Sequence, residues 1–141
     1  MTVDKEKIRQ KLQFMRQELR KLKKFQDMNF SQFETNSLYE AAATRMLQVT
    51  IEAMLDICAH LVAREGWGLP KTYVETIELV ARHGLIPPEL IDTYKAMARF
   101  RNRVVHLYDE VNSAEIWNII QNHLEDFKPF IAGIIQRYLS E

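Results

Sequence analysis

Apolar residues recur at steps of three and four along most of the chain, which is the spacing of one face of an α-helix. Five such stripes follow one another, at residues 4–25, about 31–62, 72–81, 88–105 and 113–139. The second stripe is wide, which is typical of a helix buried against several partners. The pattern predicts an all-α protein, an antiparallel bundle of about five helices with short connections.

Residues that favour helix ends separate these stripes. Ser31 is followed three residues later by Glu34, which fits a capping box, and we expect the second helix to begin between Ser31 and Ser37. Two glycines and a proline within residues 66–70 predict its end. Pro129 lies inside the last stripe, where the loss of a backbone donor predicts a kink.

Length and composition agree with one helical domain spanning residues 1–141. A chain of 141 residues suits a single hydrophobic core, and only four Gly and four Pro leave few tight turns for a β-fold. The single cysteine, Cys58, cannot form an internal disulfide, which fits a reducing compartment. We see neither a signal-peptide pattern nor an apolar run long enough to span a membrane, so we expect a cytoplasmic protein.

Charge is balanced overall but not along the chain. The sequence has 19 basic and 19 acidic residues, which gives no general signature of a nucleic-acid-binding protein. Residues 1–24 nevertheless carry nine Lys or Arg against three acidic residues. A basic helix face attracts phosphate backbones, but a solvated outer face explains the same pattern, and both interpretations stay open.

Residues 99–111, at the end of the fourth stripe, hold the densest group of reactive side chains. They include Arg99, Arg101, Asn102, Arg103, His106, Tyr108, Asp109 and Glu110. At about 100° per residue, Asn102 and His106 share one face of a regular helix, and Arg101 and Tyr108 share another. Arg101 and His106 lie about 140° apart, so one copy of the segment predicts only half of a site.

The segment from Arg101 to Tyr108 follows the pattern Arg-x4-His-x-Tyr, with an asparagine directly after the arginine. This pattern resembles the signature of HEPN domains and, with the tyrosine, that of the HepT ribonuclease toxins. Residues 45–57 are similar to the second helix of that family, and residues 85–90 followed by 97–102 are similar to its fourth. The resemblance therefore covers nearly the whole chain.

The resemblance implies an endoribonuclease toxin of a type VII-like toxin–antitoxin pair, acting on RNA, with tRNA as the expected target. It implies a homodimer whose cleft holds Arg101, Asn102 and His106 as the catalytic set, with no metal and no other cofactor. The residue types suit this chemistry, because histidine holds either protonation state near neutrality and guanidinium grips two phosphate oxygens. Arg99 and Arg103 are candidate contacts to RNA phosphates.

The resemblance also implies a partner, an MntA-like minimal nucleotidyltransferase antitoxin that transfers AMP to the motif tyrosine, here Tyr108. A bulky anion beside the arginine and histidine would fill the site and compete for its cations. A different interpretation stays open: a non-catalytic HEPN binding module that forms a complex with a nucleotidyltransferase. In that module the motif would serve as a contact to a nucleotide or to the partner. Taken without the resemblance, Arg101 and Arg103 would make ordinary ion pairs near Asp109 and Glu110, and the helix dipole would favour a cationic His106.

Two other features suggest chemistry at first sight. Glu52 and Asp56 stand one helical turn apart and resemble half of a carboxylate metal site, but the matching Glu-x-x-His pairs are missing from the sequence. Cys58 has no evident activating base, and we expect it to be a small buried hydrophobic residue. We therefore expect no metal site and no reactive thiol.

Overall fold

The computed structural model describes residues 2–106 and 111–140, and all regular structure in these residues is helical. The α-helices are α1 (Lys5–Lys23), α2 (Phe30–Thr35), α3 (Ser37–Glu65), α4 (Tyr73–Arg82), α5 (Ile91–Val105), α6 (Ser113–Asn122) and α7 (Lys128–Ile134). Three 3-10 turns, Lys24–Asp27, Pro88–Leu90 and Leu124–Phe127, and a π-helical turn, Ile135–Leu139, adjoin them. The all-α prediction is confirmed, and the second and fifth predicted helices are each divided in two.

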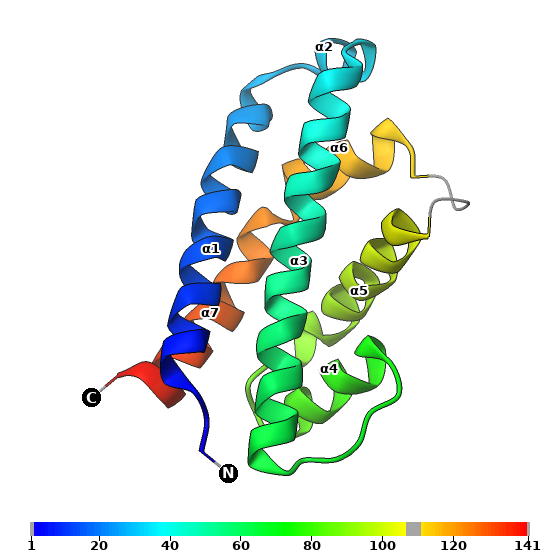
Figure 1. The fold of residues 1–141 in the computed structure, drawn as a ribbon. Helices are drawn as coiled ribbons and strands as arrows, with labels where there is room; N and C mark the ends of the chain where they lie inside the picture. The colour runs from blue at the N-terminus through cyan, green and yellow to red at the C-terminus, as the bar shows by residue number, and fades with distance from the viewer. Residues whose placement is uncertain (1, 107–110, 141) are drawn as a thin grey trace.

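The long helix α3 lies at the centre of the bundle (Figure 1). Twelve of its 29 residues are buried. Helix α1 runs antiparallel along one side of it, and α4 and α5 pack on the other side (Figure 1). Cys58 is fully buried here, and desolvation raises the pKa of its thiol to about 12, so the expected inert cysteine is confirmed.

By length and hydropathy alone, α3 is a candidate membrane span, although no apolar run of that length was expected from the sequence. Of the most apolar stretch, 61% is buried inside the protein. The central helix of a bundle passes the same test of length and hydropathy, because it too is surrounded by apolar side chains.

The predicted capping box is displaced by two residues. The backbone N–H of Gln32 donates to Asn29 Oδ1 at 2.8 Å, and the backbone N–H of Asn29 donates to Gln32 Oε1 at 3.0 Å. Ser31 lies inside the first turn of α2 instead of capping a helix with Glu34. The reason lies in packing, because this register buries Phe33 completely. A second asparagine then caps α3, which ends as predicted at a glycine with left-handed backbone, φ 68°.

The last stripe does not form one kinked helix. Helix α6 ends at Asn122, and a 3-10 turn leads into α7, where Pro129 occupies the first turn. Proline fits this position because its missing N–H would have no partner within the helix. The predicted kink at Pro129 is therefore wrong, and the break lies before it. The Tyr94 hydroxyl stabilises the break by donating to the Asp126 carbonyl oxygen at 2.6 Å.

The N-terminal segment is tied to α3 through His60. The Asp4 amide donates to His60 Nε2 at 2.9 Å, so this nitrogen must be unprotonated. Burial lowers the pKa of His60, and the nearby cations Lys7 and Arg64 lower it further. We expect the free energy of unfolding to fall as the pH drops below about 6.5, because the unfolded chain binds a proton there before the folded one does.

Thermal unfolding of wild type and His60→Gln at about pH 7.5 and about pH 5.5 measures this effect. Acidification should lower the melting temperature of the wild type more than that of His60→Gln. The exposed His83, changed to Gln, serves as the control and should behave as the wild type does. Equal losses in wild type and His60→Gln would contradict the assignment.

Candidate functional site

Helix α5 sets the orientation of the motif side chains. Ala98 and Phe100 are buried against the core, which fixes the rotation of the helix about its axis. Arg101 and Asn102 consequently lie half-buried at the edge of α5, and Arg99 is exposed.

His106 marks the end of this helix. Its amide donates to the Asn102 carbonyl oxygen at 3.0 Å, which completes the last helical turn, and its own backbone is extended, with φ −87° and ψ 95°. Its side chain is exposed. The regular helix on which the predicted shared face of Arg101 and Tyr108 depends therefore stops at His106, and Tyr108 lies outside the described residues.

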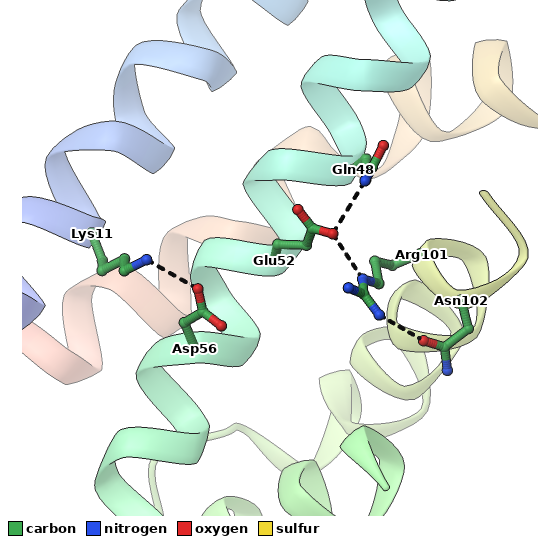
Figure 2. Close-up of polar contacts among 6 residues, drawn as sticks. All are labelled: Lys11, Gln48, Glu52, Asp56, Arg101 and Asn102. Carbon is green, nitrogen blue, oxygen red and sulfur yellow. Dashed lines mark hydrogen bonds and ion pairs between the residues drawn. The ribbon is translucent and has the colours of Figure 1, made fainter. Parts of the chain in front are cut away.

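Arg101 is held by contacts from three helices. Its Nε donates to Glu52 Oε2 on α3 at 2.9 Å, and its Nη1 donates to Asn102 Oδ1 at 3.3 Å (Figure 2). The Tyr73 ring of α4 lies below the guanidinium, with Cζ 5.4 Å from the ring centroid. Gln48 adds a further hydrogen bond to Glu52 Oε2 at 3.2 Å. The guanidinium therefore has a defined place.

Arg103 and Arg99 differ in their surroundings. Arg103 makes a two-pronged ion pair with Glu115 of α6, in which Nη1 lies 2.9 Å from Oε2 and Nη2 contacts Oε1. The Arg99 side chain makes no hydrogen bond or ion pair with any residue that the structure describes. Of the two candidate phosphate contacts, Arg103 is therefore engaged within the protein, whereas the exposed Arg99 points its charge to solvent.

The structure brings Arg101 and Asn102 together but does not join Arg101 to His106. Within residues 2–106 and 111–140, no hydrogen bond connects these two side chains. This spacing is compatible with the expectation that one chain supplies half of a site. The dimer itself stays a prediction.

A shallow groove of about 540 Å³ runs beside the motif, with α3 on one side and Val104 and Val111 on the other. It is lined by Ser37, Glu40, Ala41, Thr44, Arg45, Gln48, Val104 and Val111. Gln48 lines this groove and also donates to Glu52, which binds Arg101, so the groove adjoins the motif.

Three of the basic residues of α1 lie away from the motif and its groove. Arg16, Arg20 and Lys23 line a second groove, of about 700 Å³, between α1 and the last helical segment. In Figure 1 this part of the bundle is on the opposite side of α3 from α5. These cations therefore do not extend the surface of the motif.

Glu52 is the residue of the site that sequence reasoning missed. Figure 2 shows that Glu52 and Asp56 turn to different neighbours: Glu52 to Arg101, and Asp56 to Lys11 of α1, with Nζ 3.0 Å from Oδ2. In the described part of the chain, no three His, Cys, Asp or Glu residues are grouped so as to hold a metal ion. The sequence signal was the one-turn spacing of the two acids, which does not indicate the cation that each of them meets.

Comparison with known sequences decides the family. The ribonuclease HepT-like family matches residues 15–134. The chain belongs to the HepT-like ribonuclease family. Among HepT-like relatives, the mRNA nuclease HepT of Shewanella oneidensis is 35% identical over 101 residues, which are 72% of this chain and 76% of the relative. The tRNA nuclease HepT of Aphanizomenon flos-aquae is 24% identical over 127 residues, 90% of this chain and 86% of the relative.

Solved HepT-like structures have the same fold. The tri-AMPylated HEPN toxin of Shewanella oneidensis, in complex with MNT antitoxin, matches with a TM-score of 0.84 and 29% identity, over 93% of this chain and 98% of that one. A toxin–antitoxin structure with AMP-PNP matches with a TM-score of 0.85 and 28% identity, over 94% and 99% of the two chains. The expected HEPN-like bundle is thereby confirmed.

The Arg103–Glu115 pair should couple α5 to α6 measurably. The two side chains are 38% and 31% exposed, so solvent screens the pair and we expect a coupling energy of about 0.5–1 kcal/mol. A double-mutant cycle with Arg103→Gln and Glu115→Gln, followed by urea unfolding, measures it. The more exposed Arg9–Glu6 pair is the control and should give a smaller value. A coupling energy of zero would show that the pair does not hold the helices together.

Proposed function

We propose that this HepT-like protein is an endoribonuclease toxin whose catalytic set is Arg101, Asn102 and His106. Each chain would act as a single HEPN domain over residues 1–141, and two chains would contribute to one cleft. The observation that carries this proposal is the half-buried Arg101, fixed by Glu52 and Asn102, with the exposed His106 about one turn further along at the helix end.

The proposed reaction needs only groups that the motif contains. The ribose 2′-oxygen attacks the adjacent phosphorus and loses its proton to a base, while the bond from phosphorus to the 5′-oxygen breaks and that oxygen takes up a proton from an acid. The products are a 2′,3′-cyclic phosphate and a 5′-hydroxyl. His106 is suited to either proton transfer, and Arg101 to the negative charge that grows on the phosphate oxygens. We propose that the reaction proceeds in this way without a metal ion.

A cleft made by two chains would bring an arginine and a histidine together although Arg101 and His106 of one chain are not joined. Within one chain no hydrogen bond joins the described side chains of Arg101 and His106, whereas a second copy placed against the first would supply another histidine and another arginine. One His106 would then accept the proton of the 2′-oxygen while the other donates a proton to the 5′-oxygen. Arg99, exposed on the same helix, would contact a neighbouring phosphate.

RNA is the proposed substrate because the matched relatives are named as nucleases of mRNA and of tRNA. Both classes of RNA belong in the test, with tRNA as our expected target. RNA and ATP are both present in the cytoplasm, where we expect the protein to act.

We further propose a partner, a minimal nucleotidyltransferase antitoxin that transfers AMP to Tyr108. The matched Shewanella toxin is tri-AMPylated and in complex with MNT antitoxin, which supports this proposal. Tyr108 follows His106 by two residues in the sequence. Each added AMP would bring a negative charge beside the motif cations, where an RNA phosphate would otherwise bind.

Cleavage of purified tRNA and mRNA by wild type, Arg101→Ala and His106→Ala tests the proposed activity. We expect each variant to lose at least about 100-fold in rate, the usual contribution of a general acid–base group or a transition-state charge contact, and to stop inhibiting growth. Arg16→Ala, on the other side of the bundle, is the matched control and should cut as the wild type does. A folded wild type that cuts no RNA would favour the non-catalytic binding module.

Modification of Tyr108 is tested by mass spectrometry after co-expression with the nucleotidyltransferase. The wild type should gain the mass of one or more AMP groups and lose RNA cleavage, and Tyr108→Phe should gain none. Tyr39→Phe is the control, because Tyr39 is an exposed tyrosine at the start of α3 and should leave the modification unchanged. AMP found at another residue would contradict the assignment.

A further inference from the structure

Glu52 binds the guanidinium of Arg101 at Nε and not at either of the two outer nitrogens, Nη1 and Nη2. The bond runs from Nε to Glu52 Oε2, and Gln48 donates to that same oxygen from one turn earlier on α3. Figure 2 shows the three side chains in a row, Gln48, Glu52 and Arg101, bridging α3 and α5. The carboxylate is thus itself oriented by a second side chain.

This arrangement leaves the outer end of the guanidinium available. A guanidinium has five N–H groups, of which Glu52 takes the one on Nε and Asn102 takes one on Nη1. No other hydrogen bond from Arg101 to a described residue is present, so both N–H groups of Nη2 and the second one of Nη1 have no acceptor there. Those are the groups that form a two-pronged contact with a phosphate.

The support behind Glu52 is rigid. It lies between the fully buried Ile51 and the buried Ala53 on the central helix, so its backbone is fixed by the core. The Glu52 and Arg101 side chains are 27% and 22% exposed, and the Tyr73 ring covers one face of the guanidinium. Partial burial strengthens the attraction between the charges and limits the rotamers that Arg101 can adopt.

We infer that Glu52 is a positioning residue for Arg101: it holds the guanidinium through Nε, so that the Nη groups face the scissile phosphate. This inference rests on the proposed ribonuclease function and assigns no contact between Glu52 and RNA. Correct placement of a charge-stabilising group matters because a displacement of about 1 Å costs on the order of 100-fold in rate.

The opposite role, a carboxylate that blocks Arg101 until RNA displaces it, fits the geometry less well. A blocking carboxylate would occupy the Nη groups, where the phosphate binds, whereas Glu52 occupies Nε. The two roles predict opposite results. Removal of a positioning residue slows cleavage, and removal of a blocking residue speeds it.

The chain offers a close control for the test. Asp56 stands one turn beyond Glu52 on the same helix and is also half-exposed, but it pairs with Lys11 and not with Arg101. We would measure kcat and KM for RNA cleavage with Glu52→Ala, Glu52→Gln, Asp56→Ala and Asp56→Asn. Melting temperatures would establish that each variant is folded at the assay temperature.

Glu52→Ala should lower kcat by about 10- to 100-fold with a smaller change in KM, because it misplaces Arg101 without removing its charge. Glu52→Gln should recover part of the loss, since the glutamine oxygen still accepts from Nε. Both Asp56 variants should keep kcat within about twofold of the wild type. A purely structural role for Glu52 would lower the melting temperature and leave kcat of the folded protein unchanged.

A second measurement needs no RNA cleavage. The Nε–H resonance of Arg101 in ¹⁵N-labelled protein should be protected from solvent exchange in the wild type and in Asp56→Ala, and should lose that protection in Glu52→Ala. Unchanged kcat in Glu52→Ala beside an active wild type, faster cleavage by that variant, or an unprotected wild-type Nε–H would each overturn the inference alone. A wild type that cuts no RNA would instead overturn the proposed function and this role with it.

Discussion

The burial of α3 is the constraint on which the remaining structure depends. A helix with apolar residues on most of its surface must be covered from several sides, and α1, α4, α5 and α6 all pack against it. Two of its carboxylates then lie along the seams with neighbouring helices. Asp56 comes to the seam with α1 and Glu52 to the seam with α5, so the packing of the core decides which cation each carboxylate meets.

The ion pairs along these seams contribute more to orientation than to stability. Pairs that remain partly exposed are worth about 0–1 kcal/mol, because water already stabilises the separate charges. Apolar burial is the larger contribution to the fold. The main effect of the Glu52–Arg101 pair is therefore to place the guanidinium near the end of α5. The buried Phe100 anchors another face of the same helix in the core.

The relation to HepT-like proteins shows how such a fold persists at moderate identity. The solved toxins match over almost their whole length with 28% and 29% identity. Protein cores tolerate exchanges among apolar residues of similar volume, so a helical bundle can keep its arrangement at this level of identity. Function follows the site and not the bundle, which makes the contacts of the motif residues the informative part of the comparison.

The sequence by itself determined the helical class, the approximate extent of the five apolar stripes, the end of α3 at Gly66 and the place of the motif at the end of α5. These are local properties, because periodicity, caps and left-handed glycines act within a few residues. Even so, the local signal at Ser31 and Glu34 gave the wrong register for the cap near residue 30: the structure uses Asn29 and Gln32, and it buries Phe33 completely.

Only the tertiary structure decided the partners of the motif side chains. Glu52 lies 49 residues before Arg101, and Glu115 lies 12 residues after Arg103, on different helices in both cases. Helical periodicity indicates which face a residue occupies, but the identity of the facing residue depends on how two helices are packed and rotated against each other. The sequence therefore identified the arginine, and the fold supplied the carboxylate that holds it.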